Sequence, residues 1–247
     1  MAIQAERLED QTFIPPWVRF EHLARYEFAA QYVKGKTVID CACGDGTGSE
    51  IFLKAGAEHL LAFDLSDAAV EKAKARCASM KAEAQACSGE NLPIPQQFSD
   101  VYICLETIEH IEQDQKILQE AVRVLKPEGI FICSTPNRTV TNPGTLISDK
   151  PWNQFHIREY SQEEFIALLK SAFCRIELYG QNQKRRLKTH LMESLAKILP
   201  KHGAVQLNQI MKFPWLFCDR LEYHRVQVLD DQWDYEYVVA VCREPRR

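Results

Sequence analysis

The feature that most constrains this chain is a glycine-rich turn between an apolar run and a helix start, in residues 38–49, which read VIDCACGDGTGS. Two β-branched residues lead into Asp40, glycines follow at positions 44, 46 and 48, and the next residues have the spacing of a helix. Glycine lets a backbone approach a ligand closely, and a helix start offers free N–H groups. The stretch therefore predicts a strand, a turn and a helix that together hold a cofactor.

A second acid stands where such a cofactor would place its ribose. Asp64 ends the apolar run 60–63, roughly 20 residues beyond the turn, and a carboxylate there can accept both ribose hydroxyls. Leu65 follows and can pack on an adenine ring. Nicotinamide enzymes use the same arrangement, so Asp64 alone does not identify the cofactor.

The turn departs from the G-x-G-x-x-G spacing of nicotinamide and flavin enzymes. Its small residues fall at 42, 44, 46 and 48, Asp45 would repel a pyrophosphate, and Asp40 suits a cationic group such as an ammonium. These features resemble motif I of the class I S-adenosylmethionine-dependent methyltransferases, which usually have glycine at the position of Ala42. The run LKPEG at 125–129, followed by STPN at 134–137, is similar to a pairing typical of the same family.

The resemblance implies a Rossmann-like α/β fold: a seven-stranded, mostly parallel sheet with helices on both faces and an antiparallel last strand. We expect residues 1–247 to form one such domain, with 1–34 as an arm and helix over the cofactor and 181–232 as an insertion before the last strand. The insertion includes an aromatic run at 213–217 and can be a lid, a dimer interface or a membrane-surface contact. The sequence does not decide among these roles.

The resemblance also distributes cofactor contacts along the chain. Residues 21–26 resemble a segment whose polar side chains reach the methionine end of the cofactor, although a plain amphipathic helix explains them equally well. Ser88 stands where the family commonly has an acid for the adenine amino group, so adenine recognition would depend on the backbone near Gly89. The expected cofactor site comprises Arg25, Tyr26, Asp40, Ala42, Gly44, Gly46, Asp64, Leu65, Ser88, Gly89 and Leu105.

The chemistry is expected directly after the predicted strand at 100–104. If residues 106–111 form a helical turn, Glu106, Glu109 and His110 lie at i, i+3 and i+4 on one face, and His156 from the long following loop can join them. Two carboxylates and two imidazoles suit a divalent ion such as Mg²⁺, Mn²⁺, Zn²⁺ or Fe²⁺. The pattern is similar to the metal-dependent O-methyltransferases of ubiquinone biosynthesis and to the small-RNA 2′-O-methyltransferases. A histidine that only packs structurally is the competing interpretation.

These residues favour a metal-assisted O-methylation of a small molecule or a sugar hydroxyl. Two adjacent hydroxyls would chelate the ion, so a catechol-like or vicinal-diol acceptor is expected, with Glu106, His110 and His156 as the catalytic groups. One alternative is a metal-independent N-methyltransferase on a small amine. Another is a non-catalytic S-adenosylmethionine-binding module, and the turn spacing makes a nicotinamide oxidoreductase the least favoured.

Charge and cysteine usage argue against several other classes. The net charge of −4 argues against a general nucleic-acid binder. No apolar run approaches the ~20 residues that cross a bilayer, so no stable membrane insertion is expected. The nine cysteines are scattered, mostly in apolar runs, which is typical of buried thiols in a reducing cytoplasm. A homodimer through the insertion is compatible with all of these features.

Overall fold

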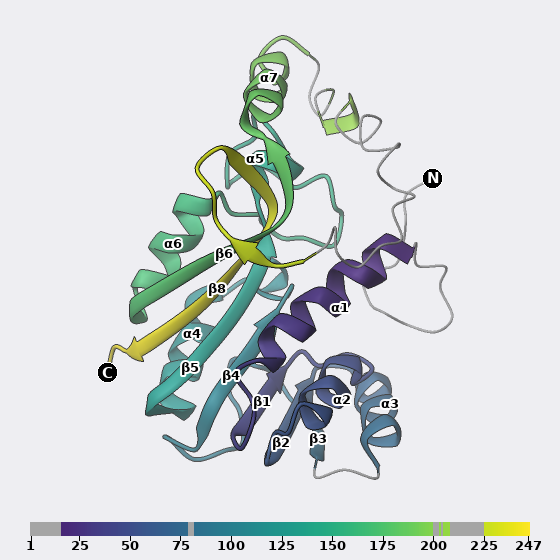
Figure 1. Cartoon of the computed structure of the whole chain (residues 1–247), viewed down its shortest axis with the longest axis vertical. Helices are drawn as coiled ribbons and strands as arrows, with labels where there is room; N and C mark the ends of the chain where they lie inside the picture. The colour runs from purple at the N-terminus through teal and green to yellow at the C-terminus, as the bar shows by residue number, and fades with distance from the viewer. Residues whose placement is uncertain (1–15, 79–81, 200–202, 204, 208–224) are drawn as a thin grey trace.

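The computed structural model describes residues 16–78, 82–199, 203, 205–207 and 225–247. Its centre is one eight-stranded sheet with the order β3-β2-β1-β4-β5-β8-β6-β7 (Figure 1). The strands are β1 (Thr37–Cys41), β2 (His59–Asp64), β3 (Ala82–Ala86), β4 (Ser99–Leu105), β5 (Leu125–Pro136), β6 (Phe173–Arg185), β7 (Gln227–Val228) and β8 (Trp233–Pro245). Neighbours from β3 to β5 are parallel, whereas β8 runs antiparallel to both β5 and β6.

The sheet confirms the expected Rossmann-like fold, with small differences in the strands. The sequence predicts seven strands, and the eighth is β7, a two-residue strand that pairs with Tyr179 and Gly180 of β6. β5 begins at Leu125 rather than at the predicted Gly129. β6 continues to Arg185, so the first five residues of the expected insertion belong to the sheet.

Helices cover both faces of the sheet, because alternate strand residues are buried on opposite sides. They are α1 (Pro16–Ala30), α2 (Thr47–Lys54), α3 (Asp67–Cys77), α4 (Asp114–Val124), α5 (Arg138–Thr141), α6 (Gln162–Lys170) and α7 (Arg186–Ala196), with one 3-10 turn, η1 (Ile108–His110). Val38 belongs to the apolar cluster that contains Phe52 of α2, and Ile39 belongs to the cluster that contains Ile117 of α4. Burial on both faces accounts for the continuous apolar runs in the sequence.

Two helix starts are set by side chains that the sequence predicts. The Ser66 hydroxyl accepts a hydrogen bond from the Ala69 N–H at the start of α3. Ser161 and Glu164 form the capping box that begins α6. Because this capping box fixes the start of α6, it also fixes where the long loop after β5 ends.

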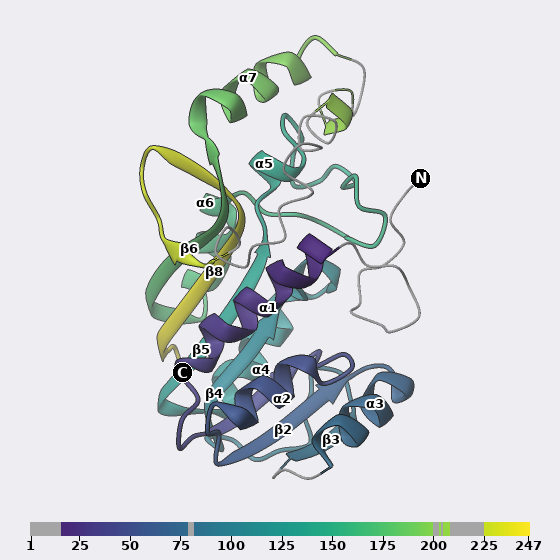
Figure 2. The same cartoon turned by 45° about the vertical axis from the view of Figure 1, so that its right-hand side comes forward.

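The carboxyl ends of β1, β2, β4 and β5 meet at one edge of the sheet, where the strand order reverses between β1 and β4. β1 leads into the glycine turn, β2 ends at Asp64, β4 leads toward η1, and β5 leads into the loop that contains His156. Helix α1 lies across the sheet beside α2 (Figures 1 and 2). Open α/β sheets bind ligands at such an edge, so the fold brings the glycine turn, Asp64, η1 and the loop with His156 to the edge where a ligand is expected.

Part of the expected insertion packs on the loop after β5. A methyl group added at Gly144 would lie 2.3 Å from the Cβ atom of Ala196, so α7 approaches this loop closely. The aromatic run 213–217 and residues 1–15 of the expected arm lie outside the described residues. No helix in the described part of the chain is long and apolar enough to cross a membrane.

Candidate active site

The glycine turn after β1 uses left-handed backbone at three positions. Gly44 and Gly46 have φ angles of 54° and 81°, which glycine adopts without a steric penalty. Ala42 also lies in this region, with a φ of 60°, at the position where the resembled family usually has glycine. An L-residue there costs about 1–2 kcal/mol. The departure at Ala42 therefore places a strained residue in the cofactor turn.

Asp64 links the end of β2 to the glycine turn. Its carboxylate accepts hydrogen bonds from the backbone N–H of Gly44, at 3.0 Å, and of Ser66, at 2.9 Å. The next side chain, Leu65, is 75% exposed and open to a ring that stacks on it. The backbone of β2 therefore presents an acid and an apolar side chain side by side, as the sequence predicts for a nucleoside.

The two acids at the turn itself have different surroundings. Asp45 forms an ion pair with Arg76 of α3 at 2.6 Å, so its charge is already compensated. Asp40 is buried and accepts a 2.6 Å hydrogen bond from Ser49. Burial raises the pKa of Asp40 from 3.8 to about 6, with a further rise from Asp64 and an opposing effect of the Ser49 hydrogen bond. Asp40 is therefore the carboxylate at the turn that lacks a nearby cation among the described residues.

The expected adenine-side residues follow β3. The Ser88 hydroxyl accepts a 3.2 Å hydrogen bond from the Glu90 N–H. A Cβ atom at Gly89 would lie 2.5 Å from the Sγ atom of Cys41, so only glycine fits there without a shift. Leu105 ends β4 and packs against the apolar cluster on the α1 side of the sheet. These residues line the same sheet edge as the turn.

Arg25 of α1 is almost completely buried, with 1% of its surface exposed. Its Nη1 donates to Gln181 of β6 at 2.5 Å, and its guanidinium lies 4.4 Å from the ring centre of Tyr237 in β8. Its Nε lies 3.7 Å from a Glu106 oxygen and has no hydrogen-bond partner among the described residues. A buried guanidinium with a spare donor fits a carboxylate such as that of the cofactor.

Tyr26, the other expected contact in α1, lies against the start of α2. A Cβ atom at Gly48 would be 2.8 Å from the Tyr26 ring. The third glycine of the turn therefore provides space for this aromatic side chain. Sequence reasoning did not find Gln181 and Tyr237, because nothing in their own surroundings in the sequence links them to Arg25.

Glu106 lies outside the cluster that the other expected metal ligands form. The helical turn predicted for 106–111 begins only at Ile108, and Glu106 precedes it with a left-handed φ of 48°. Its carboxylate accepts a 2.6 Å hydrogen bond from Ser134 in β5. The prediction that Glu106 shares one helical turn with Glu109 and His110 is therefore wrong. Left-handed backbone at a non-glycine residue is often found at functional sites.

Glu109, His110 and His156 converge. One ligand atom from each lies within 4.8 Å of the others. η1 carries the first two, and the loop after β5 brings the third, because the Ile157 N–H donates to the Glu109 carbonyl at 2.9 Å. The structure thus brings together three of the four expected metal ligands.

The carboxylate of Glu109 suits a cation. It is fully buried, and one oxygen accepts a 3.0 Å hydrogen bond from Thr135, whereas Oε1 has no partner among the residues described. Burial and the charge of Glu106 raise the pKa of Glu109 above its ordinary value, and His156 opposes this rise. A buried, unpaired carboxylate oxygen beside two imidazoles fits one ligand of a divalent ion.

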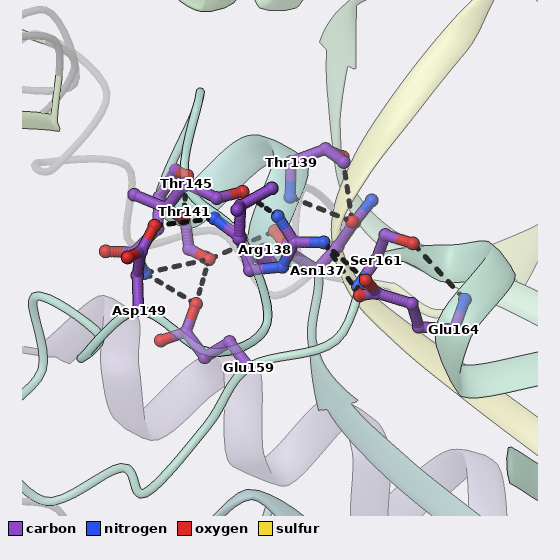
Figure 3. Close-up of polar contacts among 11 residues, drawn as sticks. Asn137, Arg138, Thr139, Thr141, Thr145, Asp149, Glu159, Ser161 and Glu164 are labelled. Carbon is purple, nitrogen blue, oxygen red and sulfur yellow. Dashed lines mark hydrogen bonds and ion pairs between the residues drawn. The ribbon is translucent and has the colours of Figure 1, made fainter. Parts of the chain in front are cut away.

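Both histidines have the outer hydrogen bonds typical of metal ligands. His110 Nδ1 lies 3.0 Å from the Phe155 carbonyl oxygen, and His156 Nδ1 lies 2.7 Å from a Glu159 oxygen. Such partners fix the orientation of each ring, and His156 Nε2 lies 3.0 Å from the side-chain nitrogen of Asn153. Figure 3 shows Glu159 beside Thr141, which is also a hydrogen-bond partner. Sequence reasoning did not find Glu159, although its His-x-x-Glu spacing from His156 was a usable signal.

Comparisons with known proteins agree with this fold. A family described as a methyltransferase domain matches residues 39–133. A probable S-adenosylmethionine-dependent methyltransferase of Mycolicibacterium smegmatis is 32% identical over 161 residues, 65% of this chain and 60% of that protein. A mitochondrial ubiquinone biosynthesis O-methyltransferase of Schizosaccharomyces pombe is 34% identical over 111 residues, 43% of this chain and 40% of that protein.

A solved structure extends the agreement over the sheet. A methyltransferase of Thermotoga maritima, described as a possible histamine N-methyltransferase, matches 92% of this chain and 93% of its own, with a TM-score of 0.61 at 16% identity. The fold is that of a class I methyltransferase, and residues 39–133 belong to the methyltransferase-domain family. The chain is similar to S-adenosylmethionine-dependent methyltransferases over these residues and beyond them. It spans about three fifths of the length of the first curated relatives that it matches.

Proposed function

We propose that the chain transfers a methyl group from S-adenosylmethionine to a hydroxyl of a small molecule or sugar, assisted by a divalent ion at Glu109, His110 and His156. The observation that carries this proposal is the convergence of these three residues within 4.8 Å. They lie at the sheet edge that also receives the glycine turn. The donor and the acceptor site would therefore be adjacent.

The residues of the cofactor site have complementary tasks in this proposal. Asp64 and Leu65 hold the nucleoside, Asp40 faces the ammonium, and Arg25 pairs with the carboxylate of the methionine part. The sulfonium carbon is electrophilic without help, so the protein has to hold an oxygen in line with it, about 3–3.5 Å away. Transfer forms the O–C bond, breaks the C–S bond and releases a proton.

The ligand set also indicates which ions and acceptors fit. Two imidazoles and one carboxylate favour Zn²⁺ or Fe²⁺ over Mg²⁺ and leave positions open for other ligands. A bound divalent ion would supply the acidity that a hydroxyl needs to become a nucleophile near pH 7. Two open positions suit a catechol-like or vicinal-diol acceptor. If no ion binds, His110 or His156 is the group that takes the proton.

The second candidate is a metal-independent N-methylation of a small amine. The buried carboxylate of Glu109 and the partly buried carboxylate of Glu106 favour it, because both lie near the sheet edge and would attract an ammonium. An amine acceptor also needs no acidified hydroxyl. Glu106 would then orient the amine, and the two histidines would have a structural role.

One set of measurements separates these functions. Calorimetry with S-adenosylhomocysteine and with NAD tests the cofactor, and NAD binding without S-adenosylhomocysteine binding would refute the family-based part. Zn²⁺ titration of the wild type and of Glu109→Gln and His110→Ala variants tests the metal, with the exposed neighbour Glu112→Gln as a matched control. We expect the first two changes to weaken Zn²⁺ binding at least tenfold and the control to leave it unchanged. Methyl transfer that survives exhaustive chelation would overturn metal assistance.

A further inference from the structure

Glu159 occupies a buried position between His156 and the short helix α5. Its side chain is only 2% exposed, and hydrogen bonds compensate for the burial of its carboxylate. One oxygen, Oε1, lies 2.7 Å from His156 Nδ1, and the other, Oε2, accepts from Thr141 and, at 2.6 Å, from the side-chain amide of Asn142. The nearby Glu164 is different, because it binds Arg138 and caps α6 (Figure 3).

A backbone group fixes the orientation of one end of this network. The Trp152 N–H donates to the Asn142 side-chain oxygen at 2.8 Å. The oxygen of this amide is thereby assigned, and its nitrogen has to be the atom that faces Glu159. The atom that stands at the place of Glu159 Oε2 must therefore accept a hydrogen bond from Asn142, so an N–H donor does not fit there.

A second backbone group fixes the other end. The Phe155 N–H donates to the Asn153 side-chain oxygen at 3.1 Å, so the Asn153 nitrogen is the atom that lies 3.0 Å from His156 Nε2. That nitrogen donates, and Nε2 must therefore carry a lone pair. The proton of a neutral His156 then resides on Nδ1 and is donated to Glu159.

We propose that Glu159 is a positioning residue that holds His156 in the Nδ1–H tautomer, with the direction of the network set by the backbone amides of Trp152 and Phe155. Nε2 is then the ring atom with a lone pair for an ion or a proton. The tautomer follows from the hydrogen bonds alone, whereas its use for metal binding rests on the proposed function. Glu159 acts through His156 and does not itself have to contact substrate.

The network predicts an unusual effect of the isosteric substitution Glu159→Gln. The Asn142 nitrogen remains a donor, so the new amide oxygen takes the position of Oε2 and the new NH₂ group faces His156 Nδ1. Nδ1 must then accept, which moves the ring proton to Nε2 and opposes the Asn153 donor. The conservative change should therefore harm the site at least as much as Glu159→Ala does.

Nitrogen NMR of the metal-free chain with ¹⁵N-labelled histidine tests the proposal without reference to activity. His156 is assigned from the signal that its own substitution removes. In the wild type we expect a protonated Nδ1 and a pyridine-like Nε2, and in Glu159→Gln the reverse. An Nε2–H tautomer in the wild type, or an unchanged tautomer in Glu159→Gln, would overturn the proposal.

Zn²⁺ calorimetry gives the second measurement, with Glu164→Gln as the matched control. We expect Glu159→Gln and Glu159→Ala to weaken Zn²⁺ binding 10- to 100-fold, and Glu164→Gln to leave it unchanged even if it lowers stability. Unchanged Zn²⁺ binding in Glu159→Gln contradicts the positioning role. If the tautomer reverses as expected but the wild type binds no Zn²⁺, Glu159 retains its role and metal assistance fails.

Discussion

Replacing Asp40 tests whether the buried charge at the cofactor turn lowers the stability of the chain while it strengthens cofactor binding. Its carboxylate is buried, and its pKa is raised from 3.8 to about 6. This higher pKa corresponds to about 3 kcal/mol of destabilisation at pH 7, where the carboxyl is charged in both the folded and the unfolded chain. We therefore expect the Asp40→Asn variant without cofactor to be more stable than the wild type.

The gain in stability of the Asp40→Asn variant depends on pH, and the raised pKa of Asp40 determines in which direction it changes. The folded chain takes up the proton more readily than the unfolded chain, so the penalty is complete above pH 6 and declines as the pH falls. The stability difference should be about 3 kcal/mol at pH 7 and about 1.5 kcal/mol at pH 5. Asparagine keeps an oxygen that can accept the hydrogen bond from Ser49, although burying its NH₂ group offsets part of the gain.

Urea unfolding at pH 7 and pH 5 measures the difference, and calorimetry with S-adenosylhomocysteine measures the functional cost. We expect the Asp40→Asn variant to bind more weakly, because in the proposed cofactor site it has lost the charge that would face the ammonium. Asp100 is a control of opposite sign, since the Thr37 N–H and Lys126 outweigh its partial burial and lower its pKa. Asp100→Asn should destabilise the chain at pH 7. An Asp40→Asn variant that is less stable than the wild type at both pH values would refute this reasoning.

Three further substitutions test other parts of the structure. Asn153→Ala removes a hydrogen bond to His156 Nε2 that an ion would have to break, so Zn²⁺ binding should tighten about fivefold by calorimetry; weaker binding would contradict this. Phe131→Ala removes a fully buried ring that stacks on Phe173 at 5.3 Å, and should cost about 3–5 kcal/mol in urea unfolding; a cost below 1 kcal/mol would disagree. Ala42→Gly relieves left-handed strain and should stabilise the chain by up to about 1 kcal/mol, and a loss of stability would show that Ala42 is not strained.

The sheet and the cofactor turn were accessible from the sequence because each depends on local chemistry. Apolar runs followed by glycine or acid marked β1 and β2, and the capping box of Ser161 and Glu164 marked α6. The approach of His156 to η1 was accessible as well, since parallel strands place the segments after β4 and β5 at one edge. These inferences needed only the order of elements and the residues at their ends.

Two features of the site were not accessible for different reasons. Glu106 is not part of a helical turn because its backbone is left-handed, and a glutamate in the sequence does not predict that conformation. The partners of Arg25 lie far along the chain, with Gln181 156 positions away, and they meet it only because β6 and β8 extend beyond the edge of the parallel strands. A position set by tertiary packing has no signature in a single sequence.

The position of β8 has a consequence for synthesis of the chain. It is the last strand in sequence, yet it lies between β5 and β6, which do not pair with each other. Until residues 233–245 leave the ribosome, both of those strands present a free edge that can pair with another chain. Tyr237, which lies beside Arg25, arrives on the same strand. Closing the sheet and completing the buried surroundings of Arg25 are therefore one late event in folding.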